Sequence, residues 1–158
     1  MTNRSVIHDT FVLERTYAAR PSTVFAAFAS EEAKSVWGDT GDIAKAQPAT
    51  GPADFDFRVG GHERFGVNHD GVSYTYDALY YDIVPDQRLV YSYEMYADDM
   101  RISVSVTTIT FVEIDNATTL TWTEQGAYLD GYDGDEAPRF RQGGTSDMLD
   151  GLVKYLAK

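Results

Sequence analysis

Residues Val72 to Met95 read VSYTYDALYYDIVPDQRLVYSYEM, and this stretch decides the fold. On both sides of the central Pro85-Asp86 pair, large and mostly aromatic side chains occupy every second position. A period of two is typical of a β-strand that buries one face. We therefore predict two strands, each with one aromatic face. Their inward residues are Tyr74, Tyr76, Ala78 and Tyr80 in the first strand and Leu89, Tyr91, Tyr93 and Met95 in the second.

These two strands are predicted to form a hairpin. Val84-Pro85-Asp86-Gln87 has the composition of a tight turn, in which proline presets the backbone angle φ at the second position. Symmetric pairing about this turn places the aromatic sets of both strands on one face of the sheet. Because a buried tyrosine hydroxyl needs a hydrogen-bond partner, such a face is often wet or open to a ligand. The predicted partners are Tyr80 with Tyr91, Ala78 with Tyr93 and Tyr76 with Met95.

Composition limits the classes of function. The 158 residues suffice for a single domain, residues 1–158, and include no cysteine, which excludes disulfides, thiolate metal sites and cysteine nucleophiles. A formal net charge of -12 repels nucleic-acid phosphates and anionic lipids, so neither nucleic acid nor membrane is expected as a partner. The first residues lack the apolar region of a signal peptide, and no stretch is long enough to span a membrane. We expect a soluble, cytoplasmic protein.

Before the hairpin, the chain is predicted to form a strand and two short helices. Polar and apolar residues alternate from Thr10 to Tyr17, and Pro21 then suits a first helical turn. Ser30 is followed by two glutamates and resembles the cap of a second helix, which runs to about Trp37. Gly38 to Pro52 is rich in Gly, Asp, Pro and Ala and is predicted to be a loop.

Further strands are predicted on both sides of the hairpin. Alternation indicates one strand at Phe55 to Val59 and another at His62 to Val67. Arg101 to Ile114 is rich in the β-branched residues that strands prefer. The apolar positions in this segment change parity, and a β-bulge near Thr107-Thr108 would account for the change.

A second hairpin is predicted to carry a carboxylate onto the apolar face. The Asp115-Asn116 turn leads into the strand Thr118 to Glu124, and symmetric pairing sets Trp122 near Ile109. The same register directs Glu124 inward, where a carboxylate is unusual. One interpretation is a strand-end carboxylate that reaches solvent or pairs with an arginine. The alternative is a pocket carboxylate that anchors a ligand or acts as a base.

The last element is predicted to be the only long helix. A Gly143-Gly144 pair precedes its apolar stripe and is expected to bend the helix or to let it approach the sheet closely. Only this helix can bury the concave face of a curved antiparallel sheet, so we predict an α+β fold in which the sheet wraps around the C-terminal helix and leaves a cavity. The residues at helical spacing are Met148, Leu149, Leu152, Val153 and Leu156.

Motifs along nearly the whole chain match one known family in order. The chain resembles the helix-grip superfamily (SRPBCC, START-like or Bet v 1-like proteins), which includes START lipid-transfer domains, pollen allergens and polyketide cyclases. Within it, the chain is similar to the AHSA1 family, the homologues of the Hsp90 ATPase activator. The resemblance implies the helix-grip fold and a shared cavity with many unrelated uses. The matching segments are FVLER at 11–15 with Pro21 and Phe25, Trp37, FRVGG at 57–61, IVP at 83–85 with RLV at 88–90, TLT at 119–121, and MLD at 148–150 with Leu152.

Candidate ligand-binding residues are those expected to line this cavity. Glu124 is the one catalytic candidate. The sequence contains no zinc motif, nucleophile elbow, phosphate loop or dinucleotide fingerprint, so neither a metal nor a cofactor is expected. The candidates are Trp37, Tyr76, Tyr80, Tyr91, Tyr93, Trp122, Glu124, Met148 and Leu152.

Three functions stay open at the level of sequence. The first is a small-molecule binding protein that holds an apolar or aromatic ligand between the sheet and the C-terminal helix. The second is a cyclase-like or hydrolase-like enzyme that uses Glu124 and tyrosine hydroxyls as acid and base. The third is an Hsp90 co-chaperone-like interaction module, which is suggested by the family resemblance and the acidic composition.

Overall fold

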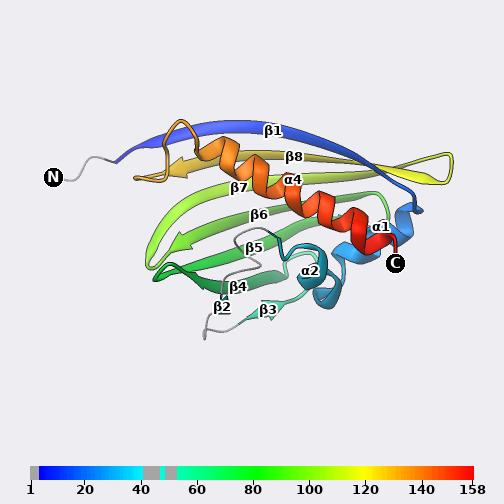
Figure 1. Ribbon diagram of the computed structural model, residues 1–158, viewed down its shortest axis with the longest axis horizontal. Coiled ribbons are helices and arrows are strands. Elements are labelled where there is room, and N and C mark those ends of the chain that lie inside the picture. Colours follow the sequence, from blue (N-terminus) through cyan, green and yellow to red (C-terminus); the bar gives the residue numbers. More distant parts are fainter. Residues whose placement is uncertain (1–3, 41–46, 49–52) are drawn as a thin grey trace.

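The computed structural model describes residues 4–40, 47–48 and 53–158. One antiparallel sheet has its strands in the order β1-β8-β7-β6-β5-β4-β2, with β3 also paired to β4 (Figure 1). The strands are β1 (Val6–Tyr17), β2 (Gln47–Pro48), β3 (Asp54–Phe55), β4 (His62–His69), β5 (Val72–Val84), β6 (Arg88–Ala97), β7 (Met100–Ile114) and β8 (Ala117–Leu129). The helices are α1 (Pro21–Phe28), α2 (Glu31–Trp37) and α4 (Ala137–Leu156).

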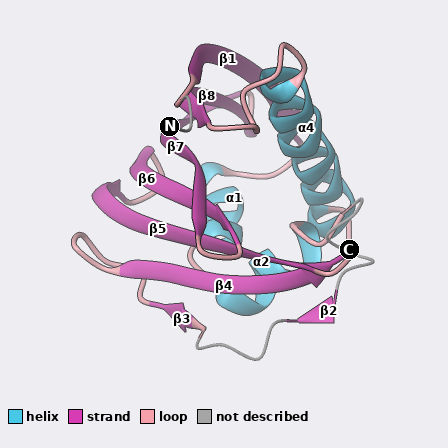
Figure 2. Ribbon diagram, turned by 90° about the vertical axis from the view of Figure 1, so that its left-hand side faces the viewer, coloured by secondary structure: helices cyan, strands magenta, loops and turns pink. Residues whose placement is uncertain are grey.

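The sheet is strongly curved, and the long helix α4 lies across its concave side (Figure 2). The two short helices α1 and α2 follow β1 and sit at one end of the sheet (Figure 1). The predicted α+β helix-grip architecture is therefore confirmed.

The aromatic hairpin has the predicted register. The turn is one residue longer than predicted, because Val84 pairs with Arg88. A bulge at Tyr81 absorbs the extra residue, so the pairs farther along the hairpin are unchanged. The observed partners are Tyr80 with Tyr91, Ala78 with Tyr93 and Tyr76 with Met95.

The second hairpin also has the predicted register, but the predicted bulge is misplaced. β7 pairs with β8 without interruption, with Trp122 opposite Ile109 and Glu124 opposite Thr107. The bulge predicted near Thr107-Thr108 is therefore wrong. The register of β7 shifts instead against β6, where Ile102 is the extra residue.

The composition of the inner face of β7 explains why the bulge was predicted at the wrong position. Ser103, Ser105 and Thr107 point inward and are almost fully buried, whereas Val104 and Val106 are 36% and 41% exposed. The valines that suggested a change of parity thus lie on the outer face. This part of the concave face is polar because, as described below, a buried ion pair occupies it.

The segment between α2 and β4 differs from its prediction. Part of the predicted loop Gly38 to Pro52 forms the short strand β2, which pairs with β4. Residues 41–46 and 49–52 of this loop lie outside the described residues. The strand predicted at Phe55 to Val59 is wrong beyond Phe55, because Asp54–Phe55 alone pairs with β4 and the chain then turns at Gly60, where φ is 84°.

Both short helices form where they were predicted. Pro21 begins α1, and the Ser30 hydroxyl caps α2 by accepting a hydrogen bond from the Ala33 backbone N–H at 3.2 Å. Phe25 and Phe28 of α1 each pack edge-on against Phe111 of β7, with ring centroids 5.5 Å apart. The two helices therefore close one end of the sheet with an aromatic core.

Helix α4 is anchored mainly through its C-terminal half. Leu149 and Leu152 are fully buried, and the Tyr17 hydroxyl donates a hydrogen bond to the Leu149 carbonyl oxygen at 3.0 Å. The Arg15 guanidinium forms an ion pair with Asp150 at 3.1 Å. Val153, which was predicted to share the apolar stripe, is 46% exposed because the buried stripe is narrower and centres on the two leucines.

Close approach of α4 occurs at Gly151, not at the Gly143-Gly144 pair. A Cβ atom on Gly151 would lie 2.5 Å from the Trp37 carbonyl oxygen of α2. A Cβ atom on Gly143 or Gly144 would meet no described atom within 4 Å. The predicted role of the glycine pair in close approach is therefore wrong.

Alanine is expected to act in opposite directions at these glycines. Gly143→Ala and Gly144→Ala should each raise the free energy of unfolding by about 0.5–1 kcal/mol, because alanine favours the helix and restricts the unfolded chain. Gly151→Ala should lower it by about 1–3 kcal/mol through overpacking against α2. Denaturant titration of the three variants measures these changes. Destabilisation at Gly143 or Gly144 would show that the space beside them is needed.

Candidate functional site

Five of the predicted ligand-binding side chains form one aromatic cluster. Four of them lie on the concave face of β5 and β6 and are here called the tyrosine wall: Tyr76, Tyr80, Tyr91 and Tyr93. Ring centroids are 5.0 Å apart for Tyr76 and Tyr93, 5.7 Å for Tyr80 and Tyr91, and 6.3 Å for Tyr91 and Tyr93. Trp122 on β8 continues the cluster, 6.5 Å from Tyr91.

Glu124 is buried beside this wall, with 1% of its surface exposed. The Tyr93 hydroxyl donates a hydrogen bond to its Oε2 atom at 2.6 Å. Its Oε1 atom accepts hydrogen bonds from the Trp122 indole N–H and the Thr107 hydroxyl, each at 3.3 Å. Both carboxylate oxygens are therefore bonded, as a buried carboxylate requires.

Arg141 of α4 compensates the charge of Glu124. Its Nη1 atom lies 3.6 Å from Glu124 Oε2 and donates a hydrogen bond to the Tyr93 hydroxyl at 2.8 Å. Its Nη2 atom donates to the Ser103 hydroxyl at 2.8 Å. The guanidinium carbon also lies 5.3 Å from the ring centroids of Tyr93 and Tyr128, a cation–π distance. Glu124, Tyr93 and Arg141 are here called the Glu124 centre.

The sequence leaves an arginine partner for Glu124 open but does not single out Arg141. Arg141 precedes the apolar residues whose helical spacing predicted the helix. The hydrophobic pattern therefore did not indicate that its side chain points toward the sheet. An available signal was the run of small polar residues at the inward parity of β7. Ser103, Ser105 and Thr107 leave room for a long side chain and offer it hydroxyl acceptors.

A second buried carboxylate was also missed. Glu63 on β4 is 7% exposed, and its Oε1 atom accepts a hydrogen bond from the Tyr80 hydroxyl at 2.8 Å. The same oxygen forms an ion pair with the Lys34 ammonium of α2. Glu63 shares the inward parity of Ala78, its partner on β5, and this register could have identified it. Glu63, Tyr80 and Lys34 are here called the Glu63 centre.

The hydroxyls of the tyrosine wall fall into two groups. Those of Tyr80 and Tyr93 are bonded to the two carboxylates, whereas those of Tyr76 and Tyr91 have no hydrogen-bond partner among the described residues. Burial raises the pKa values of Tyr80, Tyr91 and Tyr93. Nearby Glu63 adds to the rise in the pKa of Tyr80, while Arg141 opposes the rise for Tyr93. The wall therefore presents protonated hydroxyls that can donate hydrogen bonds at neutral pH.

The remaining candidates lie toward the helices. Leu152 is fully buried in the core, and Met148 is partly buried against it. Trp37 has a structural use, because its indole N–H donates a hydrogen bond to the Ala27 carbonyl oxygen at 2.9 Å and its ring packs 4.8 Å from Phe28. The ligand-binding role of all nine candidates stays a prediction.

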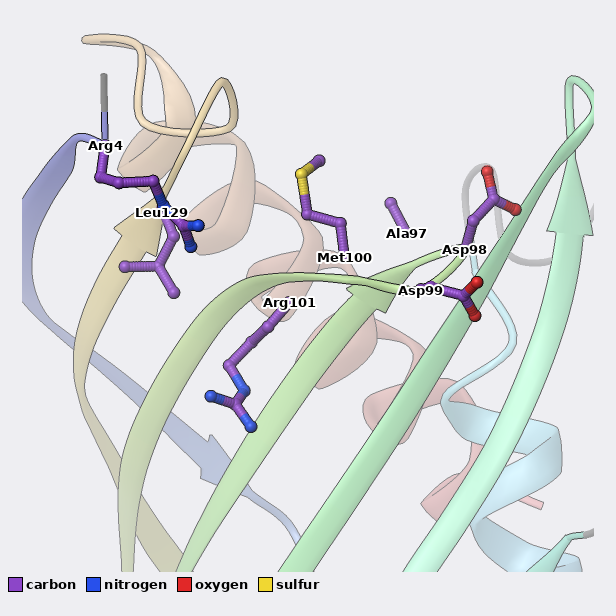
Figure 3. A pocket seen from close by; sticks show the side chains of 7 residues that line it. All are labelled: Arg4, Ala97, Asp98, Asp99, Met100, Arg101 and Leu129. Carbon is purple, nitrogen blue, oxygen red and sulfur yellow. The ribbon is translucent and has the colours of Figure 1, made fainter. Parts of the chain in front are cut away.

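Two surface hollows lie away from the candidate residues. The larger, about 620 Å³, is an open groove at the ends of β6, β7 and β8 (Figure 3). It is lined by Arg4, Ala97, Asp98, Asp99, Met100, Arg101 and Leu129. The smaller, about 500 Å³, lies between α1, α2 and the C-terminal end of α4. Neither includes a residue of the tyrosine wall.

Within residues 4–40, 47–48 and 53–158, no group of three or more His, Asp or Glu side chains is placed to hold a metal ion. The same part of the chain has no helix long and apolar enough to cross a membrane.

Comparison with known proteins relates the chain to one family. Its sequence matches the family described as Activator of Hsp90 ATPase homolog 1-like protein over residues 18–157. Among solved structures, the Mll3558 protein from Rhizobium loti is 41% identical, with a TM-score of 0.82 over 96% of this chain and 99% of that one. An uncharacterized protein from Rhizobium leguminosarum is 39% identical, with a TM-score of 0.82 over 99% of each chain.

A more distant structure shares the fold. The AHSA1 protein from Silicibacter pomeroyi is 20% identical, with a TM-score of 0.70 over 94% of this chain and 98% of that one. No match was found among curated proteins. The match over residues 18–157 covers most of the chain, and the chain therefore belongs to the Activator of Hsp90 ATPase homolog 1-like family.

Proposed function

We propose that this protein binds a small aromatic molecule against the tyrosine wall, between the sheet and α4. The observation that carries the proposal is the pair of hydroxyls on Tyr76 and Tyr91, which have no hydrogen-bond partner among the described residues. A core built for packing alone favours Leu, Ile, Val and Phe. No described side-chain oxygen is both shielded from solvent and unbonded, so these two hydroxyls can be reached by a bound molecule. A bound ligand would supply the missing partners.

A series of rings supports a route to this wall from solvent. Phe65 on β4 is 37% exposed and stacks on Tyr76, with ring centroids 5.0 Å apart. Tyr76 is half-buried and in turn lies 5.0 Å from the buried Tyr93. A planar aromatic molecule can make the same offset contacts as it passes from the surface inward.

Calorimetric titration with naphthalene and 2-naphthol tests the proposal. Both compounds are expected to bind the wild-type protein, and 2-naphthol more tightly because its hydroxyl can bond to the wall. Tyr91→Phe should weaken 2-naphthol binding by about fivefold to tenfold and leave naphthalene binding unchanged. The matched control is Tyr81→Phe, on the same sheet but 58% exposed.

Two outcomes would contradict the proposal. One is that neither compound binds at any concentration up to its solubility limit. The other is that Tyr81→Phe weakens 2-naphthol binding as much as Tyr91→Phe does, because the compound would then bind elsewhere.

An acid–base enzyme is the second candidate, and the Glu124 centre is the observation that favours it. The Tyr93 hydroxyl donates to Glu124 and accepts from Arg141, so transfer of its proton to Glu124 would leave a phenolate beside a guanidinium. Mass spectrometry of the recovered ligand distinguishes the candidates, because a binding protein returns it unchanged. A chaperone partner is a further alternative that rests on the family description alone.

A further inference from the structure

The tyrosine wall lies between two buried carboxylate centres of similar construction. Each centre combines a carboxylate from the sheet, a hydroxyl of the wall and a cation from a helix. The Glu63 centre uses α2 for its cation, and the Glu124 centre uses α4. The two centres differ, however, in which hydrogen-bonding groups they leave available.

The Glu63 centre has an available acceptor. Tyr80 and Lys34 both bond to the Oε1 atom of Glu63, and its Oε2 atom has no hydrogen-bond partner among the described residues. No described side-chain oxygen or nitrogen is both shielded from solvent and unbonded, so Oε2 can be reached. This end of the wall can therefore accept a hydrogen bond from a ligand hydroxyl.

The Glu124 centre has available donors. Both oxygens of Glu124 are already bonded, but a guanidinium carries five N–H groups. Arg141 uses three of them in hydrogen bonds to Tyr93, Ser103 and Ser105, and its side chain is 20% exposed. This end of the wall can therefore donate to an anionic or carbonyl oxygen of a ligand.

The spacing of the two ends limits the length of the ligand. Glu63 lies opposite Ala78, and Ala78 lies opposite Tyr93. The Cα atoms of Glu63 and Tyr93 are thus two strand spacings apart in one row, which is about 10 Å along the sheet. A molecule with two fused rings and a polar group at each end spans such a distance.

Building on the proposed function, we infer that the ligand is a two-ring aromatic acid with a hydroxyl at the opposite end. The hydroxyl donates to Glu63 Oε2, and the carboxylate accepts from Arg141. The rings lie against the tyrosine wall, where the hydroxyls of Tyr76 and Tyr91 have no hydrogen-bond partner among the described residues.

The test compares 6-hydroxy-2-naphthoate with 6-methoxy-2-naphthoate and 2-naphthol by calorimetric titration of the wild-type protein. The methoxy compound cannot donate to Glu63, and 2-naphthol has no carboxylate for Arg141. We expect 6-hydroxy-2-naphthoate to bind about tenfold more tightly than either, because each comparison removes one charge-assisted hydrogen bond.

A double variant locates the hydroxyl without leaving a charge unpaired. Lys34→Met/Glu63→Met removes both charges of the Glu63 centre together, which buried ion pairs usually tolerate. In this variant the hydroxy and methoxy compounds are expected to bind equally. The matched control is Glu14→Met, on the exposed face of β1, which should keep the tenfold difference.

The outcomes separate this inference from the proposed function. If all three compounds bind with equal affinity, the tyrosine wall binds aromatic rings but the two polar ends do not act, and the inference is overturned. The same conclusion follows if the double variant keeps the tenfold difference. If naphthalene compounds of every kind fail to bind, the proposed function itself is wrong.

Discussion

Arg141→Met is expected to lower the free energy of unfolding by about 3–5 kcal/mol, the usual effect of removing one partner of a buried ion pair. Glu124 is 1% exposed and would keep its negative charge with no cation beside it. The hydroxyls of Tyr93 and Ser103 would also lose the hydrogen bonds that Arg141 donates to them. The loss of a surface arginine has no comparable consequence, because water solvates the remaining charge.

Denaturant-induced unfolding of three further variants of this protein completes the experiment. Arg139→Met is the matched control, since Arg139 lies on the exposed face of the same helix, and a change within about 0.5 kcal/mol is expected. Glu124→Gln/Arg141→Met removes both charges and should be more stable than Arg141→Met, while Glu124→Gln alone completes the cycle. If Arg141→Met costs no more than Arg139→Met, Arg141 does not compensate Glu124.

Above about pH 10, the free energy of unfolding is expected to fall steeply. Burial raises the pKa values of Tyr17, Tyr80, Tyr91 and Tyr93 above the ordinary tyrosine value of 10.0. Above pH 10 an unfolded tyrosine loses its proton while the folded one keeps it, so the folded state binds more protons and stability falls as the pH rises. Each such tyrosine contributes about 1.4 kcal/mol per pH unit until its folded-state pKa is reached. Below pH 10 both states are protonated and this stability is fully present.

Denaturant titrations at increasing pH measure this slope, and phenolate absorbance reports when the tyrosines ionise. Tyr91→Phe should reduce the slope by the share of one tyrosine, and the exposed Tyr81→Phe is the matched control. Ionisation of the four buried tyrosines should coincide with unfolding. Their complete ionisation in a protein that is still folded would contradict the burial of these four side chains.

The register of both hairpins could be predicted from sequence because it depends on local features. Alternation defines the inward face of each strand, and a short turn sets the pairing. The aromatic pairs match their prediction although the turn is one residue longer than predicted, because the bulge at Tyr81 offsets the extra residue. Glu124 was directed inward by the same reasoning, since Trp122 two residues earlier has the same parity.

The inner face of β7 shows where local reasoning failed. Apolar residues normally mark the buried side of a strand, but here Val104 and Val106 lie outside while Ser103 and Ser105 lie inside. The inversion is favourable only because Arg141 fills the space over the serines and bonds to them. The small polar residues of β7 indicate room for a long side chain, but they do not indicate that α4 supplies it.

The amino-acid sequence by itself determined the strand faces, the hairpin pairs, the short helices and the aromatic wall, because each depends on residues close together in the chain. The partners of the two buried carboxylates depended on elements far apart in sequence. Lys34 reaches Glu63 from α2, and Arg141 reaches Glu124 from α4. The first contact requires α2 to lie against β4, and the second requires the path of α4 across the concave side of the sheet (Figure 2). Only the tertiary structure therefore decided that the tyrosine wall has a polar centre at each end.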